Sequence, residues 1–174
     1  MKRIIPYILI ILLLCGCSPS EEPAQIAATT LPVYEFTCRI TEGTGISVTR
    51  LVTESVSCLH DYALNVNQVK AVEAADLIVI SGAGLEDFMT DLLQDRKIID
   101  ASGNIEIREC SHDHSHSHDH SHHHEMDSHI WLSPANAKIM AQNICDGLGR
   151  RYSAYSSIFQ SNLQALLQKL DALQ

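Results

Sequence analysis

Short apolar segments alternate with amphipathic stretches over residues 25–100. Residues 25–30 and 97–100 are typical of short strands, and residues 46–52 alternate β-branched and polar side chains. Residues 77–80 form an unbroken apolar run, which is typical of a parallel strand that is buried on both faces. Because helical stretches separate these segments, the pattern predicts an α/β fold with βαβ units and a parallel sheet.

Helical spacing of apolar residues predicts three helices between these strands. They begin near residues 33, 65 and 85, and Asn65 is a suitable N-cap for the second helix. In the third helix, Glu86 and Asp87 would lie in the first turn, where negative charge offsets the helix dipole. Functional residues of a parallel sheet lie beyond the carboxyl ends of its strands, which favours the loops after Val52 and Asp100 as sites of chemistry.

The last third of the chain has two amphipathic stripes. Ser133 and Pro134 form a typical helix start, and apolar residues recur at helical spacing over 137–148. A second stripe runs over residues 155–170 and continues to the end of the sequence without a helix stop signal. We therefore expect the chain to end inside a helix whose apolar face needs a partner.

The first residues are typical of a secretion signal rather than of a folded domain. A short positive head precedes an apolar run of 11 residues, 4–14, whereas a membrane-spanning helix needs about 20. Residues 1–16 therefore read as a signal peptide, which directs the mature chain to the extracytoplasmic side of a bacterial cell envelope.

A cysteine follows this apolar run at the position of a lipid attachment site. The segment 14–17, LCGC, resembles a bacterial lipobox, which implies cleavage after Gly16 and a diacylglycerol thioether on Cys17. Multiple acyl chains on one residue are enough for stable membrane anchoring. Residues 17–24 are then a lipidated tether. An ordinary signal peptide with an incidental cysteine is the alternative.

Composition and charge narrow the class of partner. Hydrophobic residues make up 45% of the chain and charged residues 19%, which is a globular mixture, and the net charge is −9. An acidic chain of this kind argues against nucleic acid as a partner. Beyond Cys17, the cysteines considered for disulfides are Cys38, Cys58, Cys110 and Cys145. Three pairings are open to them, and reduced, buried thiols fit equally well.

Histidine is the residue type that carries the candidate chemistry. The chain has 10 histidines, and eight of them lie in residues 111–124 together with Ser and Asp only. These eight are His112, His114, His116, His118, His120, His122, His123 and His124. No core can form from this composition, and neutral imidazole is a good ligand for zinc. The segment predicts weak, multivalent metal capture, with a solvated insert of no function as the alternative.

The two remaining histidines are candidate ligands of a defined site. His60 lies in a loop that follows a predicted strand, and His129 lies just before the helix start at Ser133. A lone histidine is more often a structural hydrogen-bonding residue than a ligand. The predicted sheet, however, brings both loops to the same strand ends, which favours a shared metal site.

Five segments stand in an order that identifies a family. They are 29–34 (TTLPVY), 58–62 (CLHDY), 74–79 (AADLIV), 82–88 (GAGLEDF) and 129–134 (HIWLSP). This order resembles the zinc- and manganese-binding lipoproteins of bacterial ABC transporters, specifically the zinc-uptake type. The resemblance implies two βα lobes joined by one long helix, with the metal between the lobes. It matches His60 to the first histidine ligand and His129 to the second, and a His-rich insert is typical of zinc-preferring members.

The chain also departs from this family. The second lobe, which would supply a third histidine and a carboxylate, is missing. Residues 25–152 then form an N-terminal metal-binding lobe and residues 153–174 a truncated linking helix. Leu59 stands where some members have a carboxylate, and Ser128 stands where proline is usual. A truncated or frameshifted gene, a partial sequence and a separately encoded lobe all fit this pattern.

The favoured function is zinc binding for an ABC uptake system, without catalysis and with a membrane permease as partner. Zn²⁺ is preferred over Mn²⁺ because imidazoles favour the softer ion. Two histidines leave the site open, so binding at His60 and His129 should be loose. Because imidazoles must be neutral to bind zinc, metal capture should fade as pH falls through about 6.5. A metal buffer or adhesin-like surface lipoprotein is the alternative. A zinc hydrolase is less favoured, because no His-Glu-x-x-His segment is present.

Overall fold

The computed structural model describes residues 25–54, 59, 62–107 and 127–173, and it contains a four-stranded parallel sheet. The strands are β1 (Gln25–Ala28), β2 (Ser47–Arg50), β3 (Leu77–Ile80) and β4 (Ile98–Asp100). Their order in the sheet is β2-β1-β3-β4, and each pair of neighbours is parallel. The α/β prediction with a parallel sheet is therefore confirmed.

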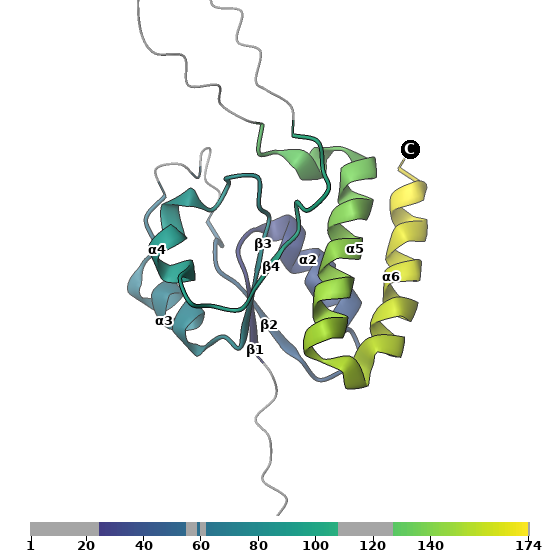
Figure 1. The fold of residues 1–174 in the computed structure, drawn as a ribbon, viewed down its shortest axis with the longest axis horizontal. Helices are drawn as coiled ribbons and strands as arrows, with labels where there is room; N and C mark the ends of the chain where they lie inside the picture. The colour runs from purple at the N-terminus through teal and green to yellow at the C-terminus, as the bar shows by residue number, and fades with distance from the viewer. Residues whose placement is uncertain (1–24, 55–58, 60–61, 108–126, 174) are drawn as a thin grey trace, which may run out of the picture.

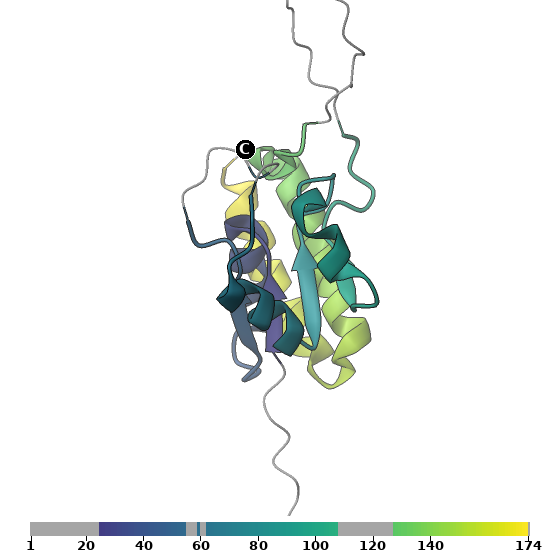
Figure 2. The same ribbon diagram turned by 90° about the vertical axis from the view of Figure 1, so that its left-hand side faces the viewer.

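Helices cover both faces of this sheet. The helices are α2 (Leu31–Thr41), α3 (Val66–Ala74), α4 (Thr90–Leu93), α5 (Pro134–Arg151) and α6 (Ser156–Asp171). Figure 1 and Figure 2 show α3 and α4 on one face and α2, α5 and α6 on the other. Within the described residues, none of these helices is both long and apolar enough to cross a membrane.

Two hydrophobic cores lie on opposite faces of the sheet. Alternate strand residues point to opposite faces. In β3, Leu77 and Val79 join the larger core beside α2, α5 and α6, whereas Ile78 joins the smaller core beside α3. The unbroken apolar run of this strand is thus buried on both sides, as predicted.

Local sequence signals explain where two helices begin. The Asn65 side chain accepts hydrogen bonds from the backbone N–H groups of Asn67 and Gln68, at 2.9 and 3.1 Å, and the Gln68 side chain accepts from the Asn65 N–H at 2.8 Å. This is a capping box, which satisfies N–H groups that have no partner in the helix. At α5, Pro134 occupies the first helical position and Ser133 is the N-cap.

The helix predicted from residue 85 is much shorter than expected. Gly82, Ala83 and Gly84 all have positive φ, so the chain leaves β3 through a tight left-handed turn. A 3₁₀ turn at Asp87–Met89 follows, and only then α4. Glu86 precedes that 3₁₀ turn and is buried. The prediction that Glu86 lies in a first helical turn and offsets the helix dipole is therefore wrong.

The apolar stripe of the last helix finds its partner within the same lobe. Figure 1 shows α6 alongside α5, and its buried residues Phe159, Leu163, Leu166 and Leu170 belong to the larger core. Asn162 Nδ2 also donates to the carbonyls of Ile40 and Glu42, at 3.0 and 2.9 Å. The apolar face therefore has the partner that it was expected to need, because the short turn after α5 folds α6 back onto α2 and α5.

The described cysteines are thiols. Cys38 is half-buried and Cys145 is buried, and both are free. Burial, together with the charge of Asp146, raises the pKa of Cys145 to about 11, so its thiol stays protonated at neutral pH. Cys58 and Cys110 lie outside the described residues.

Candidate metal site

The structure describes one of the two histidines predicted to form the defined metal site. His129 is described, whereas His60 lies in the gap at residues 60–61. The predicted lipid attachment site Cys17 and the histidines of residues 111–124 also lie outside the described residues. The geometry around His129, and around the residues that flank His60, therefore forms the observable part of the site.

His129 is held by the carboxylate of Asp127. Asp127 Oδ1 lies 3.0 Å from His129 Nδ1 and accepts a hydrogen bond of 2.9 Å from the His129 backbone N–H. These contacts, the backbone bond first, hold the pKa of Asp127 below its ordinary value. A carboxylate at Nδ1 favours the tautomer with its proton on that nitrogen, which leaves the Nε2 lone pair free for a metal.

The ring of His129 also contacts the indole of Trp131. Their ring centroids are 5.3 Å apart, at an interplanar angle of 52°. The intervening Ile130 is buried, and Trp131 packs against the larger core. The His129 side chain is nevertheless 61% exposed. The ring is therefore anchored from the core side and open to solvent on the other, as an accessible metal ligand requires.

A pocket connects the neighbourhoods of the two predicted ligands. Its volume is about 340 Å³, and its lining includes Thr30, Leu59 and Trp131. Leu59 directly precedes His60, and Trp131 is two residues after His129. Arg50 and Val52, from the end of β2, line the same pocket. Segments far apart in the sequence thus meet beyond the carboxyl ends of the strands, where parallel sheets bind ligands.

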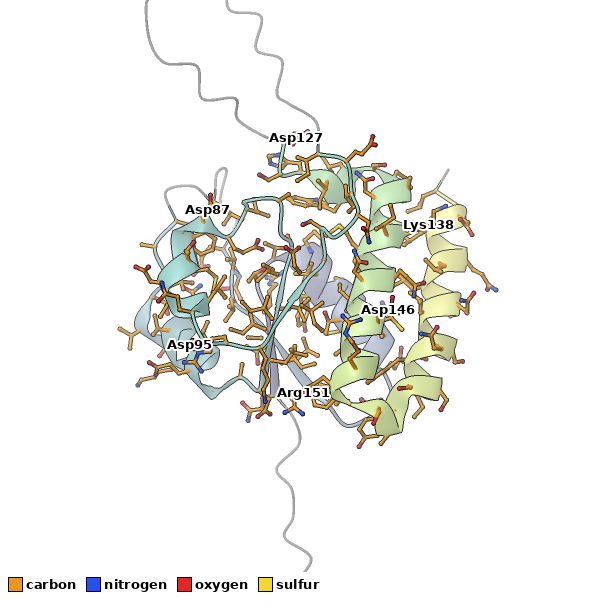
Figure 3. All side chains as sticks on the ribbon, viewed as in Figure 1. Asp87, Asp95, Asp127, Lys138, Asp146 and Arg151 are labelled. Atoms are coloured by element: carbon orange, nitrogen blue, oxygen red, sulfur yellow. The ribbon has the colours of Figure 1, made fainter. Side chains whose placement is uncertain are left out.

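A second pocket, of about 550 Å³, is lined by His129 itself. Asp127, His129, Ser133 and Asn136 line it, together with Glu106. Residues 107 and 127, which also line this pocket, flank the gap that contains the His-rich segment. Figure 3 shows Asp127 and Asp87 toward one end of the molecule, and Asp95 and Arg151 toward the opposite end.

Tyr62, the first described residue after the gap at residues 60–61, is hydrogen-bonded to Gln68 of α3. Tyr62 donates to Glu54 Oε2 at 2.6 Å and accepts from Gln68 Nε2 at 2.6 Å, and Gln68 also donates to the Leu51 carbonyl at 2.7 Å. Partial burial, and then the Glu54 bond, raise the pKa of Tyr62, so its hydroxyl stays protonated. Glu54, Tyr62 and Gln68 therefore tie both flanks of the His60 loop to the rest of the lobe.

Within the part of the chain that the structure describes, no group of three or more His, Cys, Asp or Glu side chains is arranged to hold a metal ion. Sequence reasoning did not single out Asp127 or Trp131 as site residues. The Asp127–His129 spacing is a usable signal, because an aspartate often accepts from the N–H two residues later. The contact of Trp131 with His129 has no such signal.

Comparisons with known proteins identify the family of the chain. A family model described as ZnuA, zinc-uptake complex component A, periplasmic, matches residues 26–174. The zinc-binding lipoprotein AdcA of Streptococcus pneumoniae serotype 4 is 31% identical over 176 residues, which cover 93% of this chain and 34% of AdcA. The high-affinity zinc uptake system protein ZnuA of Brucella abortus is 28% identical over 197 residues, covering 91% of this chain and 58% of the relative.

Solved structures of related zinc-binding proteins have the same fold as this chain. The Zn(II)-bound AdcA of Streptococcus pneumoniae superposes with a TM-score of 0.72 at 28% identity, over 87% of this chain and 31% of that one. Its Zn(II)-bound ZnuA-like domain gives 0.70 at 27% identity, over 87% of this chain and 53% of the domain. The chain thus spans about a third of the length of AdcA. With its parallel sheet, its strand-end pocket and a match over residues 26–174, the chain belongs to the ZnuA family of zinc-uptake components.

Proposed function

We propose that this chain is the extracytoplasmic zinc-binding component of an ABC uptake system and that Zn²⁺ is its cargo. The single observation that carries the proposal is the pocket lined by both Leu59 and Trp131, the close neighbours of His60 and His129. Membership of the zinc-uptake family supports the same function. The family comprises solute-binding components rather than enzymes, which fits a chain that binds its ion and leaves it unchanged.

In this proposal His60 and His129 supply two imidazole ligands. Asp127 binds the Nδ1 side of His129, which directs Nε2 to the metal, and Trp131 contacts the ring. Zinc usually takes four ligands in a closed site. Two imidazoles leave positions open to water or to further donors, so we expect modest affinity from these two residues. Mn²⁺, a harder ion that prefers oxygen ligands, should bind less well.

The histidines of residues 111–124 act as an auxiliary capture segment in this proposal. Residues 107 and 127, which border the gap that contains the segment, line the second pocket together with His129, which supports transfer of captured ions toward His129. Closely spaced imidazoles bind zinc in many partial coordination sets, which favours loose binding and rapid exchange. A lipid on Cys17 would keep this capture at the membrane, beside the permease that takes up the ion.

Trp131 provides the experiment, because it is the only tryptophan of the chain and contacts His129. Zinc added to the full chain should change Trp131 fluorescence, and His129→Ala should abolish or greatly weaken that change. His123→Ala is the matched control, because it removes an imidazole from the auxiliary segment only and should leave the Trp131 change intact. A wild-type chain whose Trp131 emission does not respond to zinc would contradict the proposal.

A further inference from the structure

A buried carboxylate occupies the junction between the two central strands. Glu86 is 4% exposed. Its Oε1 accepts from the Thr29 hydroxyl at 2.6 Å and from the Ser81 N–H at 2.8 Å, and its Oε2 accepts from the Gly82 N–H at 3.0 Å. Thr29 directly follows β1, and Ser81 and Gly82 directly follow β3. One side chain thus holds the ends of both strands.

This junction is the topological switch point of the sheet. From β1 the chain runs through α2 to β2 on one side, and β3 lies on the other side of β1. Helices α2 and α3 cover opposite faces, so the connections diverge at β1 and β3. Ligands of open α/β sheets bind at such switch points. In this chain, the carboxylate of Glu86 lies at this switch point, bonded to the residues that follow β1 and β3.

The turn after β3 depends on this carboxylate. Gly82, Ala83 and Gly84 have φ values of +79°, +56° and +79°, a left-handed run that an alanine seldom adopts. Glu86 binds the turn from one side. From the other side, the Ser102 hydroxyl accepts from the Ala83 N–H at 3.2 Å and donates to Asp100 at 2.7 Å. A Cβ at Gly82 would clash with the side chains of Asp100 and Ser102.

The same network reaches the pocket. Thr30 lines the pocket together with Trp131, and the Thr30 hydroxyl lies 2.8 Å from that of Ser81 in a buried hydrogen bond. Glu86 therefore connects to the pocket wall in two ways, through Thr29 next to Thr30 and through Ser81. Trp131 in turn contacts His129.

We propose that Glu86 is a positioning residue of the zinc site. Its carboxylate fixes the loops after β1 and β3, and thereby the wall of the pocket that Trp131 lines next to the ring of His129. This rests on the proposed function. All three partners of Glu86 donate hydrogen bonds, so the position requires an acceptor at both oxygens. A glutamine offers one oxygen, and its NH₂ group would face the N–H of Gly82.

Charge at this position has a physical cost that the network offsets only in part, because the pKa of Glu86 is raised overall. Burial raises the pKa of Glu86, the three donors lower it, and the charge of Asp100 raises it. A buried carboxyl without a structural or functional role would be replaced at little cost by an apolar side chain. The three donors, two of them backbone N–H groups of a left-handed turn, give the carboxylate a defined task in shaping the strand ends.

The first test compares Glu86→Gln with Asp87→Asn in the full chain. Both substitutions replace one carboxylate by an amide, but Asp87 is exposed whereas Glu86 is buried. Zinc titrations followed by Trp131 fluorescence should show half-saturation at about fivefold higher zinc in Glu86→Gln. Asp87→Asn should titrate like the wild type.

A second pair of variants, at Thr29, separates a positioning role of Glu86 from a general effect on folding. This pair tests the positioning role even if Glu86→Gln does not fold. Thr29→Val removes the hydroxyl donor and keeps the shape, whereas Thr29→Ser keeps the donor and loses a methyl group. The positioning role predicts that Thr29→Val weakens the zinc response of Trp131 and that Thr29→Ser leaves this response close to that of the wild type. If Glu86 and Thr29 had a purely structural role, their variants would differ in Tm but would give equal zinc responses once folded.

The possible failures have different signatures. Folded Glu86→Gln and Thr29→Val chains that titrate like Asp87→Asn would overturn the positioning role and leave the proposed function intact. A wild-type chain in which zinc does not alter Trp131 fluorescence would overturn the proposed function, and the positioning role with it.

Discussion

At the scale of single residues, the candidate site depends on short hydrogen bonds to carboxylates. Asp127 holds the ring of His129 at an exposed position, and Glu86 holds two strand ends at a buried one. The difference in burial decides what each can do. The exposed pair is free to exchange its surroundings for a metal ion, whereas the buried carboxylate can only fix the backbone around it.

Replacement of Asp127 should weaken zinc binding without affecting the fold. In Asp127→Asn the Nδ1–H of His129 loses a charged acceptor, which lowers the basicity of Nε2 and loosens the orientation of the ring. We expect about tenfold weaker zinc binding at His129, measured by the Trp131 titration. Asp95→Asn is the control, because Asp95 lies toward the opposite end in Figure 3 and its left-handed φ of +60° also suits asparagine. Equal zinc affinities for the two variants would contradict the role of Asp127.

At the scale of elements, α6 completes the larger core. Its apolar stripe packs against α2 and α5, and Asn162 ties it to the end of α2. An amphipathic helix of this kind is stabilised mainly by tertiary packing. The lobe that carries His129 at the start of α5 is therefore stabilised by a helix that itself contributes no residue to the two site pockets.

Truncation of the α6 stripe should destabilise the lobe strongly. Leu163 is 0% exposed, so Leu163→Ala should lower the free energy of unfolding by about 3 kcal/mol through lost burial and a residual cavity. Leu173 is 71% exposed, so Leu173→Ala should change the free energy of unfolding by less than about 0.5 kcal/mol. Urea denaturation followed by circular dichroism measures both. Similar values for the two variants would show that the α6 stripe does not contribute to the core in solution.

At the scale of the whole molecule, we expect two modes of zinc binding in one chain. In this proposal the auxiliary segment offers many interchangeable imidazoles, whereas His60 and His129 form a defined pair. We expect the two modes to differ in stoichiometry and in their effect on Trp131, because the indole of Trp131 contacts His129. The two contributions can therefore be measured separately on the full chain.

Replacement of residues 111–124 by a Gly-Ser linker of equal length should separate these modes. Isothermal titration should show fewer zinc ions bound per chain, because eight imidazoles are removed. Trp131 fluorescence should still respond to zinc, because His60 and His129 remain. Unchanged stoichiometry and affinity would show that the auxiliary segment does not capture zinc.

The sequence by itself determined the parallel sheet, the helix starts at Asn65 and Ser133, and the family. These features rest on local signals: the apolar run at Leu77–Ile80, side-chain caps, and motifs quoted directly from the chain. The pairing of His60 with His129 was also read from the sequence, and it stays a prediction because His60 lies outside the described residues.

Only the tertiary structure decided the inward direction of Glu86, the contact of Trp131 with His129 and the partner of the α6 stripe. Each depends on segments distant in the sequence. Glu86 turns inward because a left-handed turn redirects the chain after β3, and its Thr29 partner lies 57 residues away. Local periodicity reports which face of an element is apolar. What covers that face, and which polar groups meet at the strand ends, follows from how the elements pack.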